Sequence, residues 1–204
     1  MKEIISKEEL DKIMSVKGEL KGLALKNYGS FIIKEEGEEG LKKIEDAMKS
    51  IGCPIQYNKL KAMSFYPLWW SVATFLLIKR IFDYDEQKFQ EMGKFCFKFP
   101  NIMRIWAKYL ISLNRAVKSA PMMHRMYFNV GDFTVPDYSE EKKYIVIRLK
   151  NFPPYPIDFP RIYCSFLVGY YSSIVQVVTG TNTTGKETKC VYWGDDYHEF
   201  LMKW

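Results

Sequence analysis

Apolar residues in the first 120 positions recur with the three- to four-residue spacing of α-helices. Leu20, Leu23, Tyr28 and Phe31 mark one such face, and Gly37 is a suitable end for that helix. Residues 64–82 are apolar on almost every side, which predicts a central and buried helix. The helices that we predict in this half are residues 20–37, 40–52, 64–82, 85–99 and 101–120.

The period changes after Pro121. Residues 123–138 and 140–156 are rich in strand formers and are bounded by Pro, Asp and Ser, which favours two strands. Residues 164–180 form a largely apolar run of helical length. Residues 186–193 and 197–204 flank the turn residues Gly-Asp-Asp, as the strands of a hairpin would. We therefore predict one domain, residues 1–204, with a helical part (1–120) and a ββαββ part (121–204).

Composition narrows the class of protein. A chain of 204 residues with 48% hydrophobic residues is long and apolar enough for one buried core. Its net charge of +6 is not concentrated in Lys/Arg tracts with interleaved aromatic residues, which argues against a nucleic-acid partner. The charged N-terminus is unlike a signal peptide, and no apolar run reaches the roughly 20 residues of a membrane span. We expect a cytoplasmic protein whose four cysteines stay reduced.

The motifs of common catalytic sites are absent from the sequence. It contains no glycine-rich phosphate loop, no G-x-S-x-G and no H-E-x-x-H, and it has only two histidines. The stretch GTNTTGKET ends somewhat like a phosphate loop, but Glu187 interrupts it and it follows a predicted helix instead of opening one. We therefore expect a surface loop there and no enzymatic activity.

Four residues near the C-terminus carry side chains that suit tetrahedral Zn²⁺: Cys164, Glu187, Cys190 and His198. If the hairpin turns near Gly194, Cys190 and His198 lie opposite each other, with Cβ atoms about 5 Å apart. Cys164 begins the predicted helix, so the start of that helix would pack against the hairpin. Glu187 would point to the opposite face of an ideal strand, so only a bend or bulge could bring it to the site.

Zinc at such a site would be structural, because four protein ligands leave no open position for substrate. It would tie the helix to the hairpin and add its binding free energy to the stability of the fold. The alternative is that Cys164 and Cys190 are small buried hydrophobic residues and that His198 is an exposed strand residue.

The strings CSFLVGYY, ETKC and GDDYH resemble the C-terminal signature of the 4-vinyl-reductase-type small-molecule-binding domains. These include the sensor domains of phenol-responsive transcriptional activators. In that family a helix Cys, a Glu, a Cys three residues later and a further Cys bind structural zinc. The resemblance gives these roles to Cys164, Glu187 and Cys190, with His198 where the last Cys is usual. Zinc binding remains chemically possible after that change, because imidazole also binds zinc.

The order of elements resembles a wider superfamily. It joins these domains to heme-based nitric oxide and oxygen sensors and to a family of vesicle-tethering subunits. The resemblance implies an α+β fold in which helices cap a four-stranded antiparallel sheet, with a crossover helix between the two strand pairs. It also implies a ligand pocket between the helices and the sheet.

Aromatic residues are plentiful where such a pocket would lie, although at helical spacing they are also typical of an ordinary core. His124 lies roughly where the related phenol sensors place a histidine that hydrogen-bonds the ligand; otherwise it is a structural residue. Val168 stands where an aromatic residue would suit those sensors, so phenol specificity is not transferred. The candidate ligand-binding residues are His124, Trp69, Trp70, Phe95, Trp106 and Tyr127.

His124 is also conceivable as an axial heme ligand. The heme sensors, however, carry a Tyr-x-Ser-x-Arg motif for the porphyrin carboxylates. Here YYSSIVQ has Val175 and Gln176 where the Arg would be needed. Heme is therefore not expected.

We interpret the chain as a non-enzymatic sensor that holds a hydrophobic small molecule and a structural zinc ion. It would report the ligand through a homodimer interface or to a protein signalling partner. The alternatives are an assembly adaptor of the same fold without a free ligand, and a heme-based gas sensor.

Overall fold

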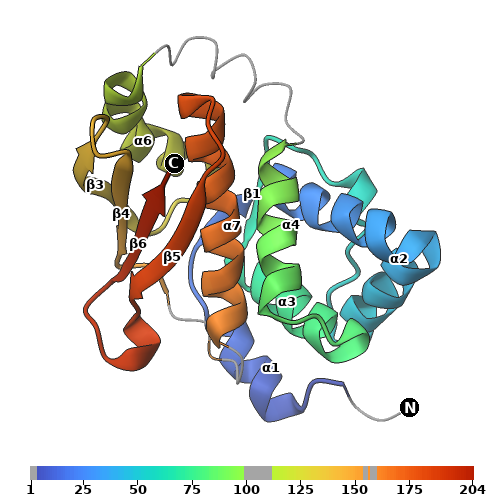
Figure 1. Cartoon of the computed structure of the whole chain (residues 1–204). Helices are drawn as coiled ribbons and strands as arrows, with labels where there is room; N and C mark the ends of the chain where they lie inside the picture. Colours follow the sequence, from blue (N-terminus) through green and yellow to red (C-terminus); the bar gives the residue numbers. More distant parts are fainter. Residues whose placement is uncertain (1–3, 99–111, 154–155, 157–159) are drawn as a thin grey trace.

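The computed structural model describes residues 4–98, 112–153, 156 and 160–204. Most of the helices lie on one side of the molecule and a sheet on the other, with one long helix between them (Figure 1). The helices are α1 (Lys7–Met14), α2 (Gly22–Ser50), α3 (Leu68–Phe82), α4 (Glu86–Lys98), α6 (Leu113–Tyr127) and α7 (Pro160–Thr179).

Four strands form the main sheet, which is antiparallel with the order β3-β4-β6-β5. Strands β4 and β6 are neighbours in the sheet, but helix α7 and strand β5 separate them along the chain. Helix α7 is therefore a crossover helix. The main strands are β3 (Asp132–Ser139), β4 (Tyr144–Lys150), β5 (Thr184–Lys189) and β6 (His198–Lys203). A small second sheet pairs β1 (Glu19–Lys21) with β2 (Phe65–Pro67). The 3-10 turns are η1 (Tyr57–Lys59) and η2 (Val191–Trp193). The predicted α+β class and ββαββ order are confirmed.

Two details of the helical half differ from the prediction. The first two predicted helices are joined in α2, where Gly37 (φ 71°, ψ −177°) produces a kink. The sequence pattern does not predict α1 or the β1–β2 sheet, because elements of eight and three residues are too short to show a clear period. Of the predicted helix 101–120, residues 101–111 lie outside the described residues.

The predicted strand over residues 123–138 is wrong in its first part. Helix α6 continues through Pro121 to Tyr127, and β3 begins only at Asp132. A proline inside a helix removes one hydrogen bond and bends the axis, but packing of one face can outweigh that cost. Met123 and Tyr127 keep the i, i+4 spacing and line the same cavity.

Alternation along β4 and β6 explains which face of the sheet is buried. Ile145, Ile147 and Leu149 of β4 point inward, and Phe200 and Met202 of β6 do the same, while their neighbours are partly exposed. Helix α7 covers this inner face. It is long and apolar enough to cross a membrane by composition, but most of it is buried, as in the core helix of a domain.

Two glycines allow the backbones of α4 and α7 to touch. A Cβ atom at Gly169 would lie 2.0 Å from the carbonyl oxygen of Gln90, and one at Gly93 would lie 2.1 Å from that of Phe166. Real carbon–oxygen contacts are never that short, so neither position can accept a side chain without separating the helices. This contact places α7 between α4 and the sheet (Figure 1).

Replacing Gly169 by alanine should therefore destabilise the fold. Overpacking of this kind costs about 1–3 kcal/mol, which exceeds the gain of up to about 1 kcal/mol in helix propensity. Thermal unfolding should show a melting temperature lower by several degrees. Gln176→Ala, an exposed change on the same helix, is the matched control; a Gly169→Ala variant as stable as this control would contradict the close contact.

Candidate metal centre and apolar cavity

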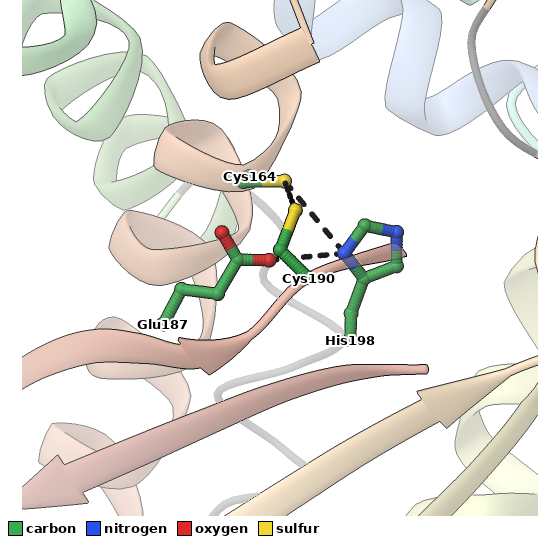
Figure 2. A group of neighbouring side chains, drawn as sticks. All are labelled: Cys164, Glu187, Cys190 and His198. Atoms are coloured by element: carbon green, nitrogen blue, oxygen red, sulfur yellow. Dashed lines mark hydrogen bonds and ion pairs between the residues drawn. The ribbon is translucent and has the colours of Figure 1, made fainter. Parts of the chain in front are cut away.

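Four side chains from α7 and the β5–β6 hairpin meet beside the inner face of the sheet (Figure 2). Cys164 lies in the second turn of α7, Glu187 lies on β5, Cys190 directly follows β5, and His198 begins β6. Their candidate ligand atoms all lie within 4.8 Å of one another. These are the four residues that the sequence proposes as zinc ligands.

The register of the hairpin explains this convergence. Lys189 pairs with Glu199, and the same register carried one residue further puts Cys190 opposite His198. The pairing shifts between Glu187 and Lys189, which is a β-bulge. This is the distortion that the sequence requires if Glu187 is to reach the site.

Two of the three distances between the ligand atoms fit the coordination shell of a zinc ion, and the third is that of a direct hydrogen bond. The Sγ atom of Cys164 lies 3.7 Å from Sγ of Cys190 and 3.7 Å from Nδ1 of His198. Oε1 of Glu187 lies 2.9 Å from that Nδ1. Tetrahedral Zn²⁺, with bonds of about 2.0–2.3 Å, separates its ligand atoms by about 3.3–3.8 Å. Two thiolates, one imidazole and one carboxylate at this spacing can hold zinc after small movements.

Burial sets the protonation of the two thiols. Cys164, Cys190 and His198 are buried, and Glu187 is nearly so. Desolvation raises the pKa of both cysteine thiols above the usual value, because a buried thiolate without a cation is costly. Both cysteines are free, and their sulfur atoms are too far apart for a disulfide bond of about 2.05 Å. A divalent cation would supply the missing positive charge.

A separate apolar cavity of about 130 Å³ lies between α2, the end of α4, α6, α7 and the sheet. Aliphatic and aromatic side chains form most of its wall. They include Ala24 and Tyr28 from α2, Ala120 and Tyr127 from α6, Leu167 and Tyr171 from α7, and Ile147 from β4. Such a wall suits an apolar guest.

The structure places two of the predicted ligand-binding residues, His124 and Tyr127, in the wall of this cavity. Trp69, Trp70 and Phe95 are not among the described residues of the wall. The two tryptophans pack against each other on α3, with ring centroids 6.2 Å apart, and Phe95 packs against Phe31 on α2. These three are partly buried aromatics packed against the core, and helical spacing alone does not distinguish such residues from pocket residues. Trp106 lies outside the described residues.

Helix α7 supplies wall residues that the sequence does not single out. Tyr163, Leu167, Tyr170 and Ile174 recur at three- and four-residue spacing and face the cavity. That spacing predicts a helical stripe but gives no sign of an empty space in front of it. Val168 lies on another side of the helix, in a polar recess next to Cys164.

His124 is held as a neutral, oriented ring. Its Nε2 lies 2.9 Å from the carbonyl oxygen of Val130, so Nε2–H donates and Nδ1 is left as an acceptor. The ring stacks on Phe128 and Phe133, with centroids 5.2 and 5.6 Å away. Burial lowers the pKa of His124 below its usual 6.5.

Comparison with solved structures now identifies the fold. No protein-family model matches the sequence, and no curated protein matches it. An H-NOX protein from S. oneidensis in the Fe(II)NO ligation state superposes with a TM-score of 0.62 at 11% identity, over 90% of this chain and 98% of that one. The Fe(II) unliganded H-NOX protein from K. algicida gives a TM-score of 0.59 at 10% identity, over 90% of this chain and 96% of that one.

The chain has an H-NOX-like fold. At identities of 10–11% this likeness shows the fold alone. A further structure of this fold, with a TM-score of 0.59 and 10% identity over 91% of this chain and 100% of the other, concerns heme redox potential and porphyrin distortion. These solved proteins go against the expectation, drawn from the sequence, that heme is unlikely in this chain.

The state of His124 is open to a direct test. Because burial lowers its pKa, its ring should titrate with a midpoint below 6.5 in an NMR pH series. The unfolded chain takes up this proton first, so the contribution of His124 to stability is full above about pH 6.5 and declines as the pH falls towards the folded midpoint. A His198→Gln variant assigns the two histidine signals; a midpoint at or above 6.5 would contradict the buried ring.

Proposed function

We propose that this protein is a non-enzymatic sensor that binds a small apolar molecule in the cavity between α2, the end of α4, α6, α7 and the sheet. The observation that carries the proposal is the cavity of about 130 Å³ beside the hydrophobic core. Dry apolar cavities of about 150 Å³ bind benzene. A guest about the size of one aromatic ring therefore matches the available volume.

His124 adds a polar group to the mostly apolar wall. The Nδ1 atom of His124 is an acceptor in the neutral ring, because Nε2 is engaged by Val130. A ring ligand with a hydroxyl or N–H group could donate to it, and a few placed polar groups commonly orient the guest in such sites. The specificity for phenol that the resemblance suggests is not carried over.

We further propose that Cys164, Glu187, Cys190 and His198 bind structural zinc. The donor types and their mutual distances support this assignment. Zinc would link the second turn of α7 to the β5–β6 hairpin and offset the cost of burying these groups. The homodimer and the protein signalling partner that the sequence suggests remain part of this proposal.

Heme is the alternative occupant of the fold, and the solved neighbours favour it. The described wall residues do not suit it: no Arg or Lys is among them to pair with the porphyrin carboxylates. In addition, Nε2 of His124 is already engaged by Val130. A Soret band in gently purified protein would decide for heme.

Filling the cavity should abolish ligand binding. Ala120→Trp places an indole in the cavity, whereas Met122→Trp adds the same indole to an exposed position of α6. Native mass spectrometry of the wild type should show a co-purifying small molecule, and single-ring aromatics should raise its melting temperature. We expect the co-purifying molecule and the rise in melting temperature to be lost only in Ala120→Trp, whose affinity for the ligand should fall by at least about tenfold. Equal ligand retention by the two variants would reject this cavity as the site.

Removing the thiolates should remove the metal. Elemental analysis of wild-type protein should give one zinc per chain, and the Cys164→Ser, Cys190→Ser double variant should contain none and melt at a lower temperature. Cys53→Ala is the control, since Cys53 is buried but lies outside the cluster. Wild-type protein without zinc, or a double variant that keeps it, would disprove the assignment.

A further inference from the structure

A polar recess of about 210 Å³ lies beside the metal centre, between α4, the start of α7 and β5. Cys164 and Glu187 belong both to the wall of this recess and to the cluster of four candidate ligands. The remaining wall includes Glu86, Arg161, Ser165, Lys186 and Trp193. The recess therefore connects the metal centre with solvent on the side of Glu187.

Glu187 differs from the other three ligands in its exposure and in the strand that carries it, although its Oε1 also lies 2.9 Å from Nδ1 of His198. Cys164, Cys190 and His198 are 3%, 1% and 2% exposed, whereas the Glu187 side chain is 10% exposed. Glu187 also sits at a bulge of β5, and β5 is an edge strand of the sheet. An edge strand can adjust locally without disturbing the inner pairing of β4 and β6. Of the four side chains, Glu187 is the most exposed and lies on the strand that is freest to adjust.

The chemistry of the donors points the same way. Zinc is a borderline-soft ion, and a carboxylate is a harder donor than thiolate or imidazole. The two thiolates already neutralise a divalent cation, so no net charge remains to hold Glu187. Arg161 and Lys186 in the recess wall offer it cationic alternatives, although Arg161 also pairs with Glu86 at 3.3 Å. A neutral nitrogen donor that replaced Glu187 would leave the charge of the inner shell balanced.

The recess also offers a surface for a flat ring. The Trp193 side chain, which follows Cys190 in turn η2, is 57% exposed and lines the recess. Its indole lies 5.4 Å from the guanidinium of Arg161. Aromatic rings stack on indole with a gain of about 0.5–1.5 kcal/mol.

We infer that the metal centre is an exchangeable site: a neutral imidazole-class nitrogen donor enters through the recess, stacks on Trp193 and takes the coordination position of Glu187. The inference rests on the proposed metal centre and deepens it. The donor is a small azole or the histidine ring of a peptide. Cys164, Cys190 and His198 keep the ion in both states.

Cobalt-substituted protein tests this with added imidazole as the probe, because the visible bands of Co²⁺ report the ligand set. Wild type should show a saturable spectral change while one cobalt per chain is retained. In Glu187→Ala the imidazole midpoint should fall about tenfold or more, since the competing carboxylate is gone. In Trp193→Ala the midpoint should rise about two- to tenfold through the loss of stacking.

The Glu187→His variant is the decisive comparison. Its cobalt spectrum should match that of imidazole-saturated wild type, and added imidazole should no longer change it. A histidine-containing peptide in place of imidazole distinguishes the two sources of the ring: saturation by the peptide at lower concentration assigns a protein ligand, and saturation by imidazole alone assigns a small azole.

Two results would overturn the inference while leaving the metal centre intact. One is a wild-type spectrum that imidazole does not change although cobalt stays bound. The other is loss of the bands as imidazole removes the metal. Failure of wild type to bind either cobalt or zinc is different, because it would remove the proposed metal centre itself.

Discussion

The contact between the backbones of α4 and α7 is the constraint on which the rest of the structure depends. Gly93 and Gly169 let each helix approach the other's carbonyl groups to a distance that no side chain would permit. Close packing of this kind leaves few alternative arrangements. With one side of α7 fixed by α4, its other sides must face the cavity and the hairpin. Both candidate sites therefore depend on the position of this helix.

The metal cluster also answers a problem created by the sheet. The alternation that buries Phe200 and Met202 of β6 places His198 on the same inner face. A buried imidazole needs partners, and the bulge in β5 brings Glu187 to within 2.9 Å of it. The two thiols complete a group of polar atoms that is satisfied within the protein and is suited to a cation.

The sequence predicts this cluster better than it predicts the cavity. The number of residues between Cys190 and His198 sets their register in the hairpin. The odd spacing of three residues between Glu187 and Cys190 shows that a bulge is required to bring both side chains to one face. Both features can therefore be read from residue spacing alone. The cavity exists because side chains from four helices and the sheet fail to fill a volume, and no local pattern along the sequence predicts that. Trp69, a predicted pocket residue, therefore packs against the core at a partly buried position instead. Element ends show the same limit: Pro121 favours a break, yet α6 continues through it to Tyr127 and forms part of the cavity wall.

Tyr163 and Cys164 are consecutive residues of α7, and one belongs to the cavity while the other belongs to the metal cluster. A small rotation or slide of this helix would displace both walls at once. If a guest in the cavity favours one position of α7, it changes the affinity for the ion, and thermodynamic reciprocity requires the ion to change the affinity for the guest by the same factor. One helix could thus make the two binding equilibria cooperative without any contact between the bound species.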